Sequence, residues 1–355
     1  MPKELSEFFG GNEIEIVRLT PNLEPDWSNF INLRDDHSVY HTLAWRNLLT
    51  ETYGYKPEYL LAVENSEVVG VLPLMLVKGI LTGKRLVSLP FSHRVPVLGS
   101  DSAQKKLLQT AVDFAHEKGI RLILKTGMPC IENEEFWELI ANFNTELDLT
   151  QDEGTLWRNA HPKKSRWAAR KAQKLGVKIV REKSDENLLS YERMELETRK
   201  RQGAPPYPTG YFQNLFKLIE NAVIQIALYN DVPIAGNILL KSGNSMIYAY
   251  GASIPEGRET GANDLLVWEA IKYSKDEGLR TFDFGSTPIQ HRMLLKFKEK
   301  WGGKTESLPY YIYPKSGKAG PKRDSFAVKL VSSLLRHIPM IIFKKFGPWL
   351  LKEVG

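Results

Sequence analysis

The sequence predicts an α/β (α+β) chain built from two similar units, and three observations support this. The chain has 355 residues, which exceeds one ordinary hydrophobic core, so we expect two domains. Segments with strand and helix periodicity alternate along it. Residues 61–70 resemble residues 227–236, and residues 116–121 resemble residues 275–280, in the same order and at similar offsets. These repeats indicate a duplicated hairpin, loop, helix and strand; chance similarity is the alternative.

The first half shows an alternation of strand and helix patterns between clear breaks. Gly119 follows a long amphipathic stretch and is expected to end that helix. Pro73 interrupts an apolar run and predicts an edge strand or a bulge. The expected strands are 14–17, 59–63, 68–77 and 121–124, and the expected helices lie within 35–53, 102–118 and 132–142.

The second half also alternates strand and helix patterns, after a polar stretch at residues 150–155. A proline-rich loop at 203–210 separates two helices, and Gly278 is expected to end a third. The expected helices are 157–176, 184–202, 211–221 and 263–275, and the expected strands are 223–229, 234–241, 245–251 and 281–286.

Charge and cysteine usage limit the class of protein. The net charge is +6, and basic residues between Arg158 and Lys183 are opposed only by Glu182. This predicts a phosphate-bearing partner, with a solvated basic face as the alternative. The single Cys130 excludes an internal disulfide and suits a reducing compartment. Because no signal peptide and no spanning apolar run are visible, we expect a cytoplasmic protein.

The C-terminal residues 326–354 combine apolar and basic side chains, and Pro339 and Pro348 break them into short helices. One interpretation is a peripheral contact with the inner face of the cell membrane, with lysines at the headgroups. Packing of the tail on the protein's own core is the other. No metal-ligand spacing, P-loop or nucleophile triad is apparent, so we expect no metal.

The stretch from 253 to 303 carries the chemistry. A glycine-containing loop at 256–262 opens a helix, which favours an anion site at the helix N-terminus. The strand that follows ends in Asp283 and Gly285, a position where α/β proteins commonly place reactive groups. A basic-aromatic segment with Phe297, Lys298 and Trp301 comes next.

These residues resemble the FemAB-type branch of the GNAT-like acyltransferases, over nearly the whole chain. The motifs that carry the resemblance are Ala44-Trp45-Arg46, Arg166-x-x-x-Arg170-Lys171-Ala172 with Gly176, Tyr250-Gly251-Ala252-Ser253, Gly261-Ala262-Asn263-Asp264-Leu265-Leu266-x-Trp268-Glu269, Asp283-Phe284-Gly285 and Phe297-Lys298-x-x-Trp301-Gly302. The tail is similar to that of a subgroup accompanying exopolysaccharide and exosortase systems.

The resemblance implies tandem GNAT-like domains, each with a mixed, mostly antiparallel twisted sheet flanked by helices. We expect them at residues 1–152 and 153–314, the second with the active site, before a basic-apolar tail at 315–355. It implies N-acyl transfer, from aminoacyl-tRNA or acyl-CoA with no tightly bound cofactor, to an amine of a phosphate-bearing peptidoglycan or polysaccharide precursor, which can be lipid-linked. The alternatives are an acetyl-CoA-dependent N-acetyltransferase on an amino sugar and a non-catalytic RNA- or membrane-associated protein.

The resemblance also assigns roles to single residues. Lys298 would steady the developing oxyanion, beside Phe297, and Arg166 and Arg170, with Lys164, would hold substrate phosphates. From the residues alone, a cation beside the oxyanion contributes ~2.7–4 kcal/mol, and arginines four apart share a helix face. A surface lysine and a solvated basic face are the alternatives.

The remaining candidates keep two interpretations each. Asp283 could orient or deprotonate the amine, or cap the following turn. Tyr250 could bind substrate or be structural. Arg258, Gly261 and Ala262 are close to the loop that cradles acyl-CoA, but Asn263, a substrate-binding candidate, replaces the last small residue. The first half has only Gly99-Ser100-Asp101 at the equivalent position, so we expect it to lack the acyl-CoA loop.

Overall fold

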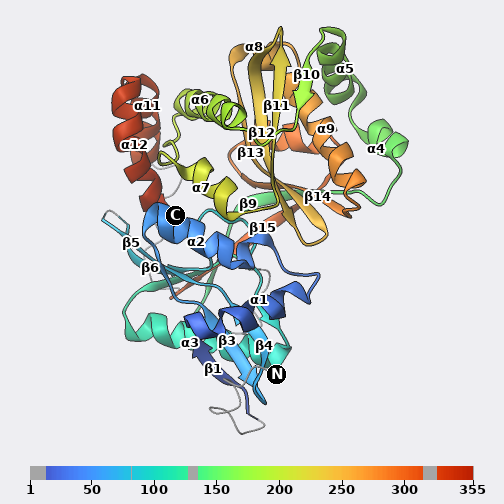
Figure 1. Cartoon of the computed structure of the whole chain (residues 1–355). Helices are drawn as coiled ribbons and strands as arrows, with labels where there is room; N and C mark the ends of the chain where they lie inside the picture. The colour runs from blue at the N-terminus through green and yellow to red at the C-terminus, as the bar shows by residue number, and fades with distance from the viewer. Residues whose placement is uncertain (1–12, 81, 127–134, 315–325, 355) are drawn as a thin grey trace. The chain divides into compact units, whose positions relative to one another are not determined.

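The computed structural model describes residues 13–80, 82–126, 135–314 and 326–354, and the side chains of 326–328 and 354 are outside the description. The chain forms two compact units (Figure 1). Unit 1 comprises Met1–Ala141, Leu308–Gly320 and Lys352–Gly355, and unit 2 comprises Asn142–Ser307 and Pro321–Leu351. The domain boundaries expected from the sequence were at residues 152 and 314. The second unit limit lies earlier in the chain, at Ser307, because the strand β15 (Lys304–Tyr313) ends by pairing with β8 (Arg121–Leu124) in unit 1.

Unit 1 contains an antiparallel sheet in the order β1-β3-β4-β7 and further strands in the order β15-β8-β6-β5-β2. Helix α3 packs on the first sheet, and its apolar face shares one core with Leu60, Leu72 and Leu122. The other elements are β1 (Glu15–Arg18), α1 (Glu24–Asn32), α2 (Leu43–Tyr53), β2 (Lys56–Pro57), β3 (Leu60–Glu64), β4 (Glu67–Leu72), β5 (Met75–Gly79), β6 (Gly83–Val87), β7 (Leu98–Gly99) and α3 (Asp101–Glu117).

Unit 2 contains strands in the order β10-β11-β12-β13-β14-β9, antiparallel except for the parallel pair β13–β14. Its largest core gathers Trp268, Phe282 and Trp301. The elements are β9 (Trp137–Asp148), α4 (Glu153–Asn159), the π-helix η3 (Pro162–Arg166), α5 (Trp167–Lys174), β10 (Lys178–Val180), α6 (Asp185–Gln202), α7 (Tyr211–Leu218), β11 (Ala222–Tyr229), β12 (Val232–Ser242), β13 (Ser245–Ser253), α8 (Pro255–Glu259), α9 (Ala262–Asp276), β14 (Thr281–Pro288), α10 (Arg292–Glu299), α11 (Phe326–His337) and α12 (Met340–Val354).

The predicted repetition has a structural counterpart in the two units. In each, an antiparallel hairpin (β3–β4 or β11–β12) precedes a long helix, α3 or α9. Each helix ends at a glycine with positive φ, Gly119 or Gly278, and the following strand pairs in parallel with an earlier one, β8 with β6 or β14 with β13. The α/β prediction with duplicated units is therefore confirmed.

Four element predictions were wrong. Pro348 does not break the tail helix, because α12 (Met340–Val354) runs through it. Proline and tertiary pairing explain the other three. Residues 137–142 form part of β9 rather than a helix, because their strand continues into pairing with β14; residues 132–134 of that prediction lie outside the described residues. Pro73 separates β4 from β5, so residues 68–77 are two strands. The helix predicted at 157–176 is broken before Pro162 into α4, η3 and α5.

Candidate functional site

The candidate site lies where β13 and β14 part. The two strands pair only from Ser245 opposite Thr281 to Ile247 opposite Asp283. Beyond that point both strands are irregular: the β12–β13 register shifts near Ile238, and the β14–β9 register shifts between Asp283 and Ser286. Gly285 has a φ of +68°, a conformation that glycine adopts without strain. The bulge leaves Phe284 and Gly285 out of the β14–β9 register, which resumes at Ser286 opposite Asn144.

Lys298, on α10, uses the carbonyls of this bulge. Its side chain is 5% exposed, and Nζ donates hydrogen bonds to Gly285 O at 2.7 Å and Ser286 O at 3.0 Å. Burial lowers the pKa of Lys298 to about 8, and the negative charge of Asp283 opposes that shift. At neutral pH the group is mainly an ammonium, and an ammonium has a third N–H for a ligand.

Asp283 holds the bulge together. Its side chain is buried, and Oδ1 accepts a hydrogen bond from Gly285 N at 2.7 Å. The Asp283 carboxylate therefore caps the turn that follows it, which is one of the two interpretations offered for this residue. The same carboxylate favours the charged form of Lys298, so the acid both shapes the backbone under the ammonium and stabilises its charge.

The junction between α4 and α5 is attached to the end of α10. Lys300 O accepts hydrogen bonds from His161 N at 2.7 Å and from Ser165 Oγ at 3.0 Å. Lys300 Nζ forms an ion pair at 2.5 Å with Asp264 of α9, whose pKa is raised by burial in spite of this partner. Arg166 ends η3, and its buried Nε has no hydrogen-bond partner. A guanidinium with an unsatisfied N–H is available for an anionic ligand.

The other basic candidates of the junction face outward. Arg170 is exposed and lies over the ring of Trp157 at 5.4 Å, and Lys164 is exposed as well. Trp167 is 59% exposed, with Lys171 Nζ 5.4 Å from its ring centre. Helix α5 therefore presents a basic surface with an exposed aromatic ring, a feature that the sequence pattern alone did not distinguish from a solvated face.

The glycine loop predicted for acyl-CoA is closed by α5. Gly261 and Ala262 are buried, and Gly261 has a φ of +85°. A Cβ on Gly261 would lie 2.4 Å from Ala168 O, so the backbone of α5 occupies the space that a diphosphate would need at this residue. Arg258 is exposed on the short helix α8.

The end of β13 has a second polar cluster. Asn263 Nδ2 donates to Ser253 Oγ at 3.3 Å, and Arg201 of α6 donates to Ser253 O at 3.1 Å. Burial lowers the pKa of Arg201, and the positive charge of Arg258 lowers it further. Sequence reasoning missed Arg201, because nothing distinguishes it from other charged residues in α6.

Two aromatic candidates occupy packed positions. Tyr250 exchanges a hydrogen bond with Tyr211 Oη at 2.7 Å and packs against the rings of Tyr207 and Phe212. Phe297 is half-buried, with Lys300 Nζ 4.3 Å from its ring centre. The structure thus brings Lys298 and Asp283 together directly, and connects Arg166 to them through the Lys300 turn.

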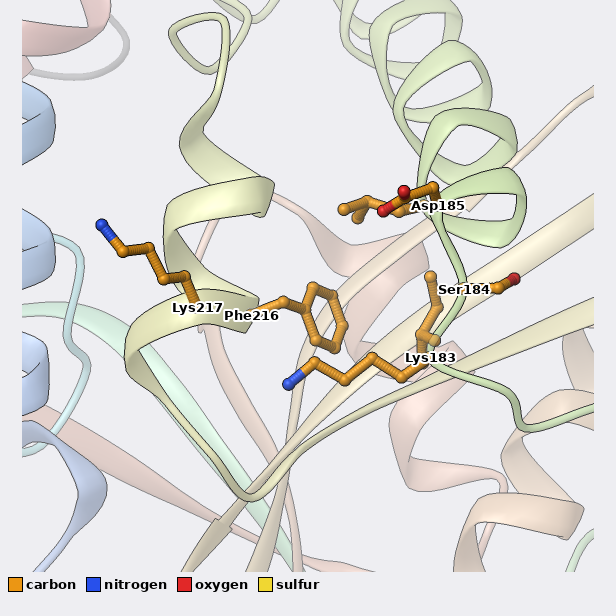
Figure 2. A pocket seen from close by; sticks show the side chains of 7 residues that line it. Lys183, Ser184, Asp185, Phe216 and Lys217 are labelled. Carbon is orange, nitrogen blue, oxygen red and sulfur yellow. The ribbon is translucent and has the colours of Figure 1, made fainter.

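A cavity of about 230 Å³ lies elsewhere in unit 2 (Figure 2). It lies at the start of α6 and against α7, where Lys183 Nζ is 5.4 Å from the Phe216 ring centre. The cavity is lined by Lys183, Ser184, Asp185, Leu188, Phe216, Lys217 and Ile224. None of them is a predicted site residue. Within the described residues, no cluster of three or more His, Cys, Asp or Glu side chains could hold a metal ion.

Comparison with known proteins gives matches in sequence. Residues 159–291 match the Acetyltransferase (GNAT) domain family. The Lipid II:glycine glycyltransferase of Staphylococcus haemolyticus (strain JCSC1435) is 32% identical over 79 residues, which cover 21% of this chain and 19% of that protein. The chain thus spans about a fifth of the length of this curated relative.

Two solved structures share the fold over most of both chains. The crystal structure of FemX has a TM-score of 0.67 at 16% identity, covering 84% of this chain and 97% of FemX. A tandem GNAT protein from the clavulanic acid biosynthesis pathway has a TM-score of 0.52 at 13% identity, covering 86% and 100%. With the sequence matches, these confirm the predicted tandem GNAT fold and FemAB-type resemblance.

The close approach of α5 to α9 gives a stability prediction. Gly261→Ala combines a positive φ with a clash against Ala168 O, so it should destabilise the protein by about 3 kcal/mol or more. Gly278→Ala is the matched control: its φ is +73°, but a Cβ there meets nothing within 4 Å, so about 1–2 kcal/mol is expected. Urea unfolding measures both, and equal losses would contradict the close packing.

Proposed function

We propose that this FemAB-like protein with the tandem GNAT fold is an aminoacyltransferase, moving an aminoacyl group from aminoacyl-tRNA to an amine of a phosphate-bearing, lipid-linked cell-wall or polysaccharide precursor. The observation that carries the proposal is the buried ammonium of Lys298, fixed on Gly285 O and Ser286 O. The printed name of the relative, Lipid II:glycine glycyltransferase, supports a lipid-linked acceptor and glycyl-type transfer.

The reaction joins the acceptor amine to the ester carbonyl of the donor. A carbon–nitrogen bond forms, negative charge develops on the carbonyl oxygen, and the carbon–oxygen bond to the ribose then breaks as the amine proton passes to the leaving oxygen. The third N–H of Lys298 would donate to the developing oxyanion. In a buried site such a donor is worth ~2.7–4 kcal/mol. Asp283 acts as a positioning residue, because it holds the bulge and the charge of Lys298.

Two features favour an RNA donor over acyl-CoA. The N-terminus of α9, where GNAT enzymes hold acyl-CoA, is covered by the backbone of α5 at Ala168. The exposed ring of Trp167, at the start of α5, follows the exposed Lys163 and Lys164 of η3. Unpaired bases stack on aromatic rings, and lysines neutralise phosphates, so this surface suits the single-stranded end of an aminoacyl-tRNA.

The acceptor's phosphates would bind at Arg166. Its Nε is buried without a partner. The segment that carries Arg166 is bonded through His161 N and Ser165 Oγ to Lys300 O, two residues after Lys298 in the sequence. A guanidinium binds a phosphate through two parallel hydrogen bonds, which orients the bound group. A lipid-linked acceptor would place the reaction at a membrane surface, with the protein attached peripherally.

The central test replaces the ammonium. Lys298→Met should lower kcat about 10²–10³-fold, because the oxyanion loses its charged donor. Lys296→Met is the matched control, since Lys296 is exposed on the same helix, and its activity should stay near wild type. The assay follows radiolabelled amino acid from charged total tRNA into butanol-extractable lipid, with lipid II as acceptor, and circular dichroism checks folding.

Two outcomes would count against this assignment. Wild-type kcat in a folded Lys298→Met variant would remove Lys298 from the chemistry. Transfer of label from acetyl-CoA, with none from charged tRNA, would instead support an N-acetyltransferase and overturn the donor assignment.

The donor surface has its own test. Trp167→Ala should weaken binding of uncharged tRNA about tenfold, because one stacked base is worth ~1–3 kcal/mol. Leu175→Ala is the matched control, since Leu175 is an exposed apolar residue that caps the same helix. Filter binding at low and moderate salt measures both variants, and unchanged tRNA affinity in Trp167→Ala would exclude stacking at this ring.

A further inference from the structure

Helices α11 and α12, drawn red in Figure 1, carry an unusual share of exposed apolar side chains. On α12, Ile341 is 82% exposed. Within the described residues, no helix is both long and apolar enough to cross a membrane. The exposed large apolar residues of the two helices are Leu330, Val331, Leu334, Ile341, Ile342, Phe346 and Trp349.

One face of α12 is already used for packing. Phe343 and Leu351 are buried, and Gly347 lies between them at four-residue spacing. A Cβ on Gly347 would lie 2.2 Å from Pro206 Cδ, so this face fits closely against the proline-rich loop. The prediction that the tail packs on the protein therefore holds for this face.

A second face of α12 has no such cover. Ile342, Phe346 and Trp349 follow one another at spacings of four and three residues, which places them on one side of the helix. Their side chains are 44%, 58% and 42% exposed. Contiguous apolar surface of this kind marks an interaction site in a soluble protein.

The charges around this face indicate its partner. Lys345 is exposed beside it, and its Nζ lies 5.9 Å from the Phe346 ring centre. From Lys329 to Lys352 the sequence contains no aspartate or glutamate. An apolar stripe bordered only by cations matches an anionic phospholipid surface, where lysines meet headgroups and aromatic rings enter the interface.

The end of α12 is fixed, so the face belongs to an ordered helix. In unit 1, Glu353 Oε1 accepts from Ile80 N at 2.8 Å, and Glu353 O accepts from Arg85 at 2.8 Å. Lys352 O accepts from Tyr55 Oη at 2.8 Å. Glu353 is the acidic residue closest to the stripe in sequence, and it is buried in these contacts.

We propose that the outer face of α12, formed by Ile342, Phe346 and Trp349 with Lys345 at its border, docks on the surface of an anionic phospholipid bilayer. The helix lies in the plane of the interface and does not span it. This surface is separate from the Lys298 site, so the proposal stands whether or not the chain is an aminoacyltransferase.

The test is flotation of the full chain with vesicles of phosphatidylcholine alone or mixed in equal parts with phosphatidylglycerol. Wild type should float with the anionic vesicles and less with the neutral ones. The combined variant Ile342→Gln, Phe346→Gln and Trp349→Gln keeps helix-compatible side chains and should lose at least about tenfold in partitioning. Replacing Lys345 with Gln should cost about fivefold on anionic vesicles and little on neutral ones.

The matched control is Leu33→Gln, an apolar residue that is 88% exposed outside the tail; it should float like wild type. Flotation of the triple variant at the wild-type level would overturn the proposal. So would sedimentation velocity showing a dimer that the triple variant abolishes, with no vesicle binding, because the occupant of this face would then be a second copy. Unchanged circular dichroism and unfolding midpoints confirm that the variants are folded.

Discussion

The candidate site depends on one buried charge and the backbone beneath it. An ammonium costs free energy when it leaves water, and Lys298 is held in place because two carbonyls of the β14 bulge replace its hydration. The bulge itself needs Gly285 at positive φ and the Asp283 carboxylate that closes the turn. Removal of any of these parts leaves an unsatisfied charge or an unsupported strand end, so strand, turn and cation form one unit.

The surrounding helices fix that unit against the junction segment. Lys300 O accepts two hydrogen bonds from the junction, and its ammonium pairs with Asp264 of α9. Gly261 lets α5 approach the start of α9 closely enough to cover it. The same packing that attaches the Arg166 segment to the end of α10 also covers the loop predicted to bind acyl-CoA, which connects the proposed choice of donor to the fold.

The two repeated units differ where the chemistry is expected. In unit 1, the helix α3 begins at Ser100, whose own side chain caps Ala103 N, and Gly99 packs against Val69 O. That helix end has no open anion site. In unit 2 the start of the corresponding helix α9 is covered by α5, and the strand bulge with the buried ammonium lies on β14 and α10. Duplication thus provided the scaffold, and one copy carries the candidate site.

Much of the fold was predictable because the signals are local. Gly119 and Gly278 end their helices as expected, and the hairpins at residues 61–70 and 227–236 follow from short apolar runs separated by polar turns. β9 was missed because its strand conformation comes from pairing with β14, a contact distant in sequence. Motif resemblance singled out Lys298 and Asp283 as candidates, but the bulge that joins them, the cover over Gly261 and the contact of Arg201 with Ser253 O arise from tertiary packing that no sequence spacing reveals.

The most direct measurement is a titration of Lys298 itself, following the Cε signal of isotope-labelled lysine by NMR and assigning it with Lys298→Met. The account predicts a pKa of about 8, because burial disfavours the ammonium more than Asp283 favours it. In Asp283→Asn, which keeps an oxygen for Gly285 N but removes the negative charge, the pKa should fall further. A Lys298 signal that titrates at the ordinary lysine value, unaffected by Asp283→Asn, would contradict a buried ammonium at this strand end.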